Sequence, residues 1–211
     1  GPGCGEFPRA PVQTAPGLCV GIVMDQPEGL RFPRVIVSLS PREFWLTDMG
    51  NWNPRRGSLW RLRLEEPAKG VIRPRLDLLA EKLDRPHGLV RGKDGLIYLG
   101  EAGSVSQWDP QSGKKLGVVV DGLPTQGLHP LTNLAVDLDG SLFINVGAPS
   151  DHCETERDRP ADVSLPCVSE ASERPEAAVY RAQYFPQTRS FAEPTLFSSG
   201  LRNSMGLAVH P

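Results

Sequence analysis

Two polar side chains stand at the same distance ahead of an apolar segment in this sequence. His129 lies five positions before Leu134, and Arg202 lies five positions before Leu207. Histidine exchanges protons near neutral pH, whereas arginine keeps its charge and presents several hydrogen-bond donors. If the two positions converge in space, they could form a polar site on a rigid scaffold. The alternative is that both are solvated loop residues, as isolated charged groups before strands commonly are.

Two further polar residues share this register, Asp84 ahead of Leu89 and Arg31 ahead of Ile36. Each precedes an apolar segment of strand length. If the segments are structural repeats, the equivalent positions are expected to face a common centre. The register therefore predicts a ring of polar groups at one mouth of a central channel.

The apolar segments themselves resemble one another. Segments 89–99 and 134–144 each consist of an apolar strand, an Asp-Gly turn and a second apolar strand. Their spacing is about 45 residues, which is typical of a propeller repeat. Asp-Gly provides the positive φ that a tight hairpin needs. Weaker copies begin at 36 and 207.

Further strands are predicted after these hairpins, at 58–64, 103–108 and 177–181. Each repeat is then an antiparallel meander, which cannot bury both of its faces alone and must stack on its neighbours. An all-β propeller satisfies this requirement, and a β-sandwich is the alternative. We expect a propeller fragment of three to four repeats over 16–211, preceded by an N-terminal arm at 1–15 and interrupted by an insertion at 148–175.

The composition is that of an ordinary soluble globular protein. Charged residues make up 23% of the chain and the formal net charge is -2, which gives no reason to expect a nucleic-acid partner. No apolar run approaches the ~18 residues that a membrane span requires. The sequence therefore predicts no transmembrane segment.

Four cysteines occur, Cys4, Cys19, Cys153 and Cys167, and none forms a Cys-x-x-Cys pair. An even number in loop-like sequence favours disulfides and an oxidising compartment, the periplasm or the cell exterior. Cys153 and Cys167 bracket a polar stretch that a disulfide would close, and Cys4–Cys19 would fix the N-terminal arm. The alternatives are four separate thiols, a lipid-bearing Cys4, or a metal ligand pair made by His152 and Cys153.

Several segments resemble the glucose/sorbosone dehydrogenase family. Segment 129–147 is similar to the family block in which a catalytic histidine precedes a strand, Asp-Gly, a second strand and glycine. Segment 148–154 resembles the following loop of the sorbosone-type branch, which often carries a cysteine. Segment 200–211 resembles the Gly-x-Arg-Asn signature, and 85–89 resembles the start of another repeat.

This resemblance implies a six-bladed propeller that binds pyrroloquinoline quinone and Ca²⁺. Such a protein is an oxidoreductase of aldoses or sugar aldehydes in the periplasm, with a quinone or cytochrome as electron acceptor. The resemblance assigns His129 as general base, and Arg202 and Asn203 as donors to the quinone oxygen. The calcium ligands are expected outside this chain.

Three departures from the family pattern are evident. Leu128 stands where the sugar oxidisers have aspartate, Thr132 stands where the sorbosone-type block often has arginine, and Ser204-Met205 replaces Pro-Gln. They motivate an alternative function, a non-catalytic propeller that binds a carbohydrate or a protein. A third interpretation is a propeller lyase or hydrolase with His129 as its base.

Overall fold

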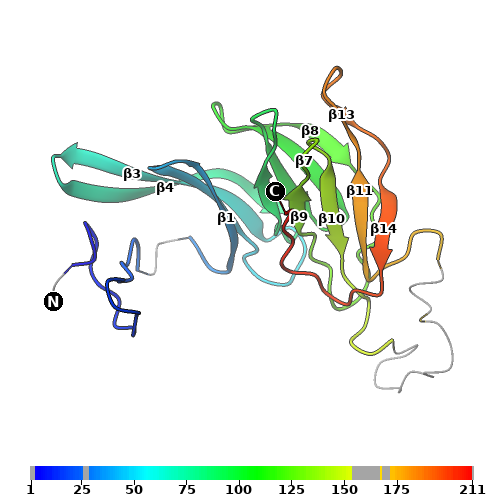
Figure 1. Cartoon of the computed structure of the whole chain (residues 1–211), viewed down its shortest axis with the longest axis horizontal. Helices are drawn as coiled ribbons and strands as arrows, with labels where there is room; N and C mark the ends of the chain where they lie inside the picture. Colours follow the sequence, from blue (N-terminus) through cyan, green and yellow to red (C-terminus); the bar gives the residue numbers. More distant parts are fainter. Residues whose placement is uncertain (1–2, 26–28, 154–166, 168–171, 211) are drawn as a thin grey trace.

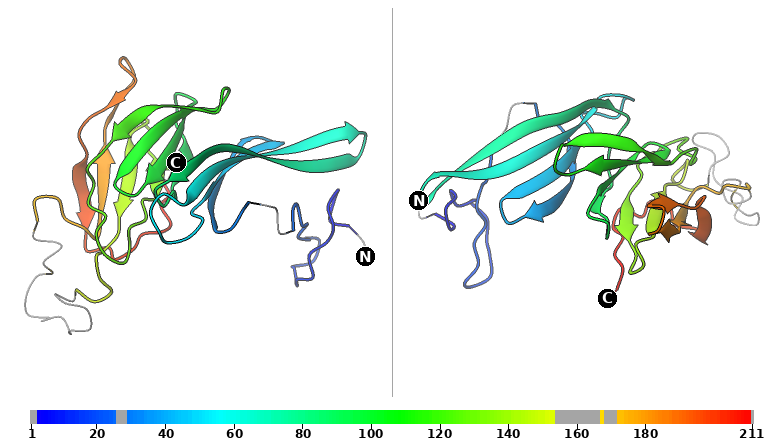
Figure 2. Two further views of the ribbon diagram at one scale, coloured as in Figure 1. Left: turned by 180° about the vertical axis from the view of Figure 1, so that it is seen from behind. Right: turned by 90° about the horizontal axis from the view of Figure 1, so that it is seen from above.

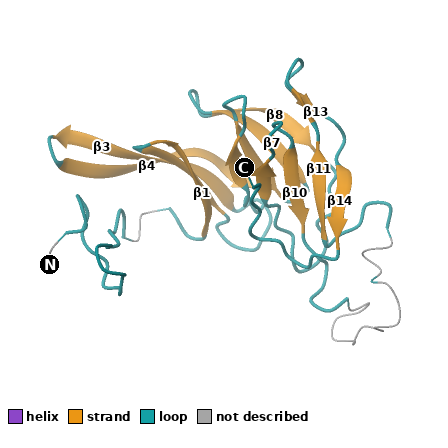
Figure 3. Ribbon diagram, viewed as in Figure 1, coloured by secondary structure: helices purple, strands orange, loops and turns teal. Residues whose placement is uncertain are grey.

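The computed structural model describes residues 3–25, 29–153, 167 and 172–210. Within these ranges the chain forms β-strands and no helix (Figure 3), and hence no helix long and apolar enough to cross a membrane. The strands are β1 (Pro33–Ser40), β2 (Glu43–Asp48), β3 (Gly57–Ala68), β4 (Val71–Leu83), β5 (Leu89–Arg91), β6 (Ile97–Glu101), β7 (Ser104–Asp109), β8 (Lys114–Val120), β9 (Leu134–Val136), β10 (Leu142–Val146), β11 (Ala178–Ala182), β12 (Tyr184–Phe185), β13 (Ser190–Phe191) and β14 (Thr195–Ser199).

These strands form three successive four-stranded antiparallel sheets (Figure 1). The first sheet has the order β1-β2-β3-β4 and the second β5-β6-β7-β8. The third has the order β14-β11-β10-β9, with the β12–β13 hairpin between β11 and β14 in sequence. The predicted all-β repeats of antiparallel strands are confirmed.

The Asp-Gly turns lie where the sequence places them. Gly95, between β5 and β6, has a φ of 84°, and Gly140, between β9 and β10, has a φ of 92°. The preceding aspartates brace the turns: Asp94 accepts a hydrogen bond from the backbone of Leu96 at 3.1 Å, and Asp139 accepts one from that of Ser141 at 2.9 Å. Glycine suits both turns because L side chains rarely adopt positive φ.

The three sheets stack through their first strands. β1 lies beside β5, and β5 lies beside β9. The Thr47 hydroxyl donates to the His87 carbonyl at 2.8 Å, and the Gly88 amide donates to the Thr132 carbonyl at 2.9 Å. A radial stack with the first strands innermost is the arrangement of propeller blades and differs from the two facing layers of a sandwich.

Apolar side chains fill both junctions between sheets. Trp45 and Leu59 of the first sheet pack with Ile97 and Leu99 of the second, and all four are fully buried. The junction of the second and third sheets is likewise apolar, and its core comprises Tyr98, Val105, Val120, Leu123, Leu134, Leu142, Ile144, Val146, Ala178, Tyr180 and Ala182. The second sheet is therefore covered on both faces.

The β3–β4 hairpin projects beyond the rest of its sheet (Figures 1 and 2). The pairing of β2 with β3 ends at Glu43↔Arg63, whereas that of β3 with β4 continues to Ala68↔Val71. Beyond Arg63 the hairpin is thus a two-stranded arm.

The start of a fourth repeat at Leu207 differs from expectation. No residue from 200 to 210 is in a strand. In the second and third sheets the first strand pairs with the strand that follows it, β5 with β6 and β9 with β10, and the described residues contain no strand after β14 that could pair with this segment. The predicted insertion at 148–175 lies between β10 and β11; residues 154–166 and 168–171 of it are outside the described residues.

Candidate functional site

Three loops meet at one end of the third sheet. His129 lies in the segment before β9, Asp151 in the loop after β10, and Arg202 in the segment after β14. Because these strands are antiparallel, the start of β9 and the ends of β10 and β14 lie at the same edge. The topology therefore brings together residues that are far apart in the sequence.

Close backbone contacts fix the frame of this site. The Ala148 amide donates to the Arg202 carbonyl at 2.7 Å, and the Leu128 amide donates to the Pro149 carbonyl at 2.9 Å. Gly147 lies so close to the His129 segment that a Cβ atom would stand 2.3 Å from the His129 carbonyl oxygen. Only glycine leaves room for this approach.

The imidazole of His129 has an oxygen at each nitrogen. Nδ1 lies 2.8 Å from the Ala148 carbonyl oxygen, and Nε2 lies 3.2 Å from Oδ1 of Asp151. A carbonyl oxygen only accepts hydrogen bonds, so Nδ1 carries a hydrogen, and Nε2 can donate to the carboxylate only when it carries a hydrogen as well. The side chain is 12% exposed, which leaves the ring held but reachable.

Asp151 joins His129 to Arg202. The Nε atom of Arg202 donates to Oδ1 of Asp151 at 3.1 Å, and Nη2 contacts the same oxygen. The Arg202 guanidinium, chiefly by hydrogen bonding, holds the pKa of the Asp151 carboxyl below its usual range, and the positive charges nearby add to this effect. One carboxylate thus contacts both of the side chains that the sequence predicts for the site.

Two buried asparagines hold the segment that carries Arg202. The Asn133 side chain donates to the Met205 carbonyl at 2.6 Å, and the Asn145 side chain accepts a hydrogen bond from the Ser204 amide at 3.2 Å. Asn145 is fully buried. Asn203, in the same segment, is exposed.

The rest of the predicted polar ring does not join this site. The backbone amide of Arg31 donates to Asp48 at 2.5 Å, and Asp84 pairs with Arg85 at 2.8 Å. Both sets of contacts lie in the first and second sheets. The shared register therefore brings only His129 and Arg202 together, through Asp151.

Sequence reasoning missed Asp151, Asn133 and Asn145. The asparagines carry a recognisable signal, because each lies beside or within a short apolar strand where a polar side chain needs a buried partner. Asp151 carries no such signal: it follows Ser150 in a loop with no periodicity, and its role depends on the loop conformation.

Both predicted disulfides are present, Cys4–Cys19 and Cys153–Cys167. Because its sulfur is bonded to Cys19, Cys4 cannot also carry a lipid thioether, and that alternative is corrected. The disulfide likewise removes Cys153 as a metal ligand. Among the described residues, no group of three or more His, Cys, Asp or Glu side chains could hold a metal ion.

A cavity of about 100 Å³ adjoins the site. It is lined by Asp151 and Arg202 on one side and by the Cys153–Cys167 disulfide on the other. The disulfide is therefore a wall of the space next to the charged groups.

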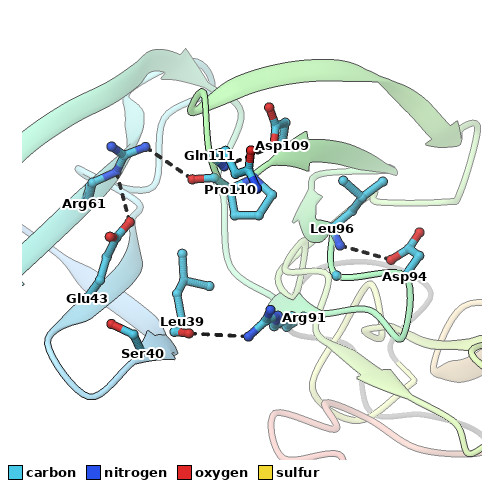
Figure 4. A pocket seen from close by; sticks show the side chains of 11 residues that line it. Leu39, Ser40, Glu43, Arg61, Arg91, Asp94, Leu96, Asp109, Pro110 and Gln111 are labelled. Atoms are coloured by element: carbon cyan, nitrogen blue, oxygen red, sulfur yellow. Dashed lines mark hydrogen bonds and ion pairs between the residues drawn. The ribbon is translucent and has the colours of Figure 1, made fainter.

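A larger cleft of about 480 Å³ lies between the first and second sheets, at the opposite end of the strands (Figure 4). Its charged groups already have partners. Arg61 contacts Glu43 at 3.4 Å and the Pro110 carbonyl at 3.5 Å, and Arg91 donates to the Leu39 carbonyl at 3.4 Å. No histidine is among the described residues that line the cleft.

No family model and no curated protein sequence matches the chain. Solved structures do match. The PQQ domain of a pyranose dehydrogenase from Coprinopsis cinerea aligns with a TM-score of 0.55 and 17% identity, over 83% of this chain and 40% of that domain. An auxiliary nutrient binding protein from Bacteroides thetaiotaomicron aligns with a TM-score of 0.50 and 15% identity, over 88% of this chain and 36% of that protein.

The chain thus spans less than half the length of either structure. At these identities the likeness concerns the fold. The three sheets are similar in fold to part of that PQQ domain.

Proposed function

We propose that this chain is part of a quinone-dependent dehydrogenase that oxidises an aldose or a sugar aldehyde. The observation that carries the proposal is the meeting of His129 and Arg202 on Asp151 at one end of the third sheet. A proton acceptor then lies beside a permanently charged hydrogen-bond donor, which is the pair that alcohol oxidation by hydride transfer requires. The fold shared with a PQQ domain supports this assignment.

In this mechanism the Asp151 oxygen that faces Nε2 gives way to the substrate hydroxyl, whose proton His129 then takes at Nε2. The Ala148 carbonyl holds Nδ1, so the ring keeps one tautomer and orientation through the transfer. The Asp151 carboxylate stabilises the imidazolium that results, because it lies 3.2 Å from Nε2. Asp151 acts here as a positioning residue in place of the aspartate that the family has at position 128.

The donor set fits pyrroloquinoline quinone at Arg202. Its side chain is 59% exposed beside His129, and a guanidinium can donate to an oxygen that gains negative charge. When bound, the quinone supplies the hydride acceptor. Among the described residues no three or more His, Cys, Asp or Glu side chains gather as metal ligands, and the calcium ligands are proposed to lie elsewhere.

The outer faces of the first and third sheets support a complete six-bladed ring. Ile36 and Leu78 belong to a cross-strand row on the first-sheet face away from the second sheet, and they are 58% and 48% exposed. On the third sheet Phe197, which packs against Phe143, is 62% exposed. Apolar faces of this kind are normally covered, and neighbouring blades would cover both.

The two disulfides support a periplasmic or secreted location, because such bonds persist in oxidising compartments.

A binding protein without catalysis is the second candidate. Its specific support is the fold shared with an auxiliary nutrient binding protein, together with the engagement of both His129 and Arg202 by Asp151. In that case the charged end of the third sheet would recognise a carbohydrate by hydrogen bonding alone.

The test is dye reduction by the full-length protein supplied with pyrroloquinoline quinone and Ca²⁺, across a panel of aldoses and sugar aldehydes. The dehydrogenase proposal predicts turnover that His129→Ala abolishes. Sugar binding without turnover would favour the binding protein instead.

A further inference from the structure

The Cys153–Cys167 disulfide lies in the same loop after β10 as Asp151, which stands just outside the segment that the bond closes. Cys153 follows Asp151 by two positions, and both cysteines line the cavity of about 100 Å³ that Asp151 and Arg202 also line. The covalent bond is therefore adjacent to the carboxylate that joins His129 to Arg202.

The segment 148–153, which follows β10 and carries Asp151, is held differently at its two ends. Its start is fixed by backbone hydrogen bonds, from Ala148 to the Arg202 carbonyl and from Leu128 to the Pro149 carbonyl. Its far end is tied at Cys153, whose φ is 60°. A residue with a side chain adopts this left-handed conformation at a cost, so it persists only where the surroundings impose it.

We propose that the Cys153–Cys167 disulfide positions the Asp151 carboxylate, and through it the His129 imidazole and the Arg202 guanidinium. This inference rests on the proposed function for its effect on turnover. Without the disulfide, Cys153 can leave the left-handed region, and the half-exposed Asp151 side chain keeps its contacts to His129 and Arg202 without that restraint on the loop. The charged site is then sensitive to oxidation state.

The chemical step is thiol–disulfide exchange. A dithiol such as dithiothreitol reduces the Cys153–Cys167 bond to two thiols and is itself oxidised to a cyclic disulfide. The second disulfide, Cys4–Cys19, lies in the N-terminal segment and provides a matched control, because none of its residues lines the cavity.

The experiment is a double-mutant cycle between Cys153→Ser/Cys167→Ser and Asp151→Asn, read out by quinone-dependent turnover. We expect the serine pair to lower turnover about tenfold, as the loss of a positioning contact does. In the Asp151→Asn background the same pair should have no further effect, and Cys4→Ser/Cys19→Ser should leave turnover unchanged. An equal loss in both backgrounds, or from the control pair, would overturn the proposal.

A second readout separates this inference from the proposed function. The imidazole ¹⁵N resonances of His129, assigned with His129→Ala, report the surroundings of Nε2 without any quinone. Asp151→Asn and the serine pair should shift them in the same direction, even in a protein that shows no turnover. If the Cys153→Ser/Cys167→Ser variant leaves these resonances unchanged, the disulfide does not position the site. If the pair does not fold, mild reduction and alkylation of the folded wild type replaces it.

Discussion

The loops before β5 and β9 occupy equivalent places in the second and third sheets, and each contains a histidine. His87 is 4% exposed and its Nδ1 has no hydrogen-bond partner within the described part of the chain. Burial, aided by the charge of Arg34, lowers the pKa of His87 to about 4. His129 instead has a carbonyl at Nδ1 and the Asp151 carboxylate at Nε2.

His87 lies two positions before β5 and His129 five positions before β9, so they are not equivalent positions of the repeat, and the chemistry of each follows from its surroundings. His87 is a neutral core side chain, because nothing near it compensates an added positive charge. His129 lies where a carboxylate can compensate that charge and where solvent reaches the ring. The two sites therefore differ in the effect expected of substitution, and the burial of His87 adds a pH dependence of stability.

The largest expected effect is the loss of turnover when His129, but not His87, is replaced by alanine. His129→Ala should lower quinone-dependent turnover by about 10²–10⁴-fold, the usual contribution of a general base. His87→Ala should leave the turnover of the folded fraction nearly unchanged while lowering the unfolding temperature, because it removes buried contacts. Dye reduction and thermal unfolding of both variants are the measurements. If both variants fold well and lose turnover equally, His129 is not distinguished from His87 as the catalytic base.

The next largest effect is a pH dependence of folding stability, which we expect His87 to cause. The pKa of His87 lies near 4 in the folded state and near 6.5 in the unfolded chain, so the unfolded chain binds the proton more tightly. The stabilisation is complete above pH 6.5 and is lost as the pH falls towards 4, by about 3 kcal/mol in all. Urea unfolding from pH 7.5 to 4.5 should show this slope in wild type and a reduced slope in His87→Gln. An unchanged slope in that variant would contradict the account of its burial.

The fold could largely be predicted from the sequence because its signals are local. An Asp-Gly pair between two apolar strands specifies a hairpin without reference to the rest of the chain, and Gly95 and Gly140 both adopt the positive φ that this requires. The segment at Leu207 failed as a strand because pairing depends on a neighbour, which apolar residues alone cannot provide.

The site was predictable only in part. The register of His129 and Arg202 follows from the repeat, whereas their connection depends on how the loop after β10 folds back. Loop conformation has no periodic signature, so Asp151 could not be assigned in advance. Asp84 shares the register but its side chain pairs with Arg85, and the contact seen at Arg31 is from its backbone amide to Asp48, which register alone does not exclude.

A smaller effect, on quinone affinity, is expected when the arginine beside each histidine is replaced. Arg202→Ala should weaken pyrroloquinoline quinone binding by about 10- to 100-fold, the value of a charge-assisted hydrogen bond. Arg34→Ala is the matched control, since Arg34 lies beside His87 and should leave the affinity unchanged. Absorbance titrations of the two variants provide the comparison, and an equal loss of affinity in both would place the quinone elsewhere.

The smallest effect is expected at Asn203, which the family resemblance also assigns to the quinone. Its side chain is exposed, and exposed substitutions typically change free energies by less than about 0.5 kcal/mol. Asn203→Ala should therefore change quinone affinity by no more than about twofold. A tenfold loss in the same titration would show that Asn203 joins the site when the quinone binds.

The most direct test of the central claim is the absorbance of protein-bound pyrroloquinoline quinone on addition of a sugar aldehyde, in wild type and in His129→Ala. The account predicts quinone binding by both proteins and spectral reduction of the quinone in wild type alone. Reduction at the same rate in His129→Ala would show that His129 is not the base, and the absence of quinone binding by either protein would contradict the dehydrogenase assignment.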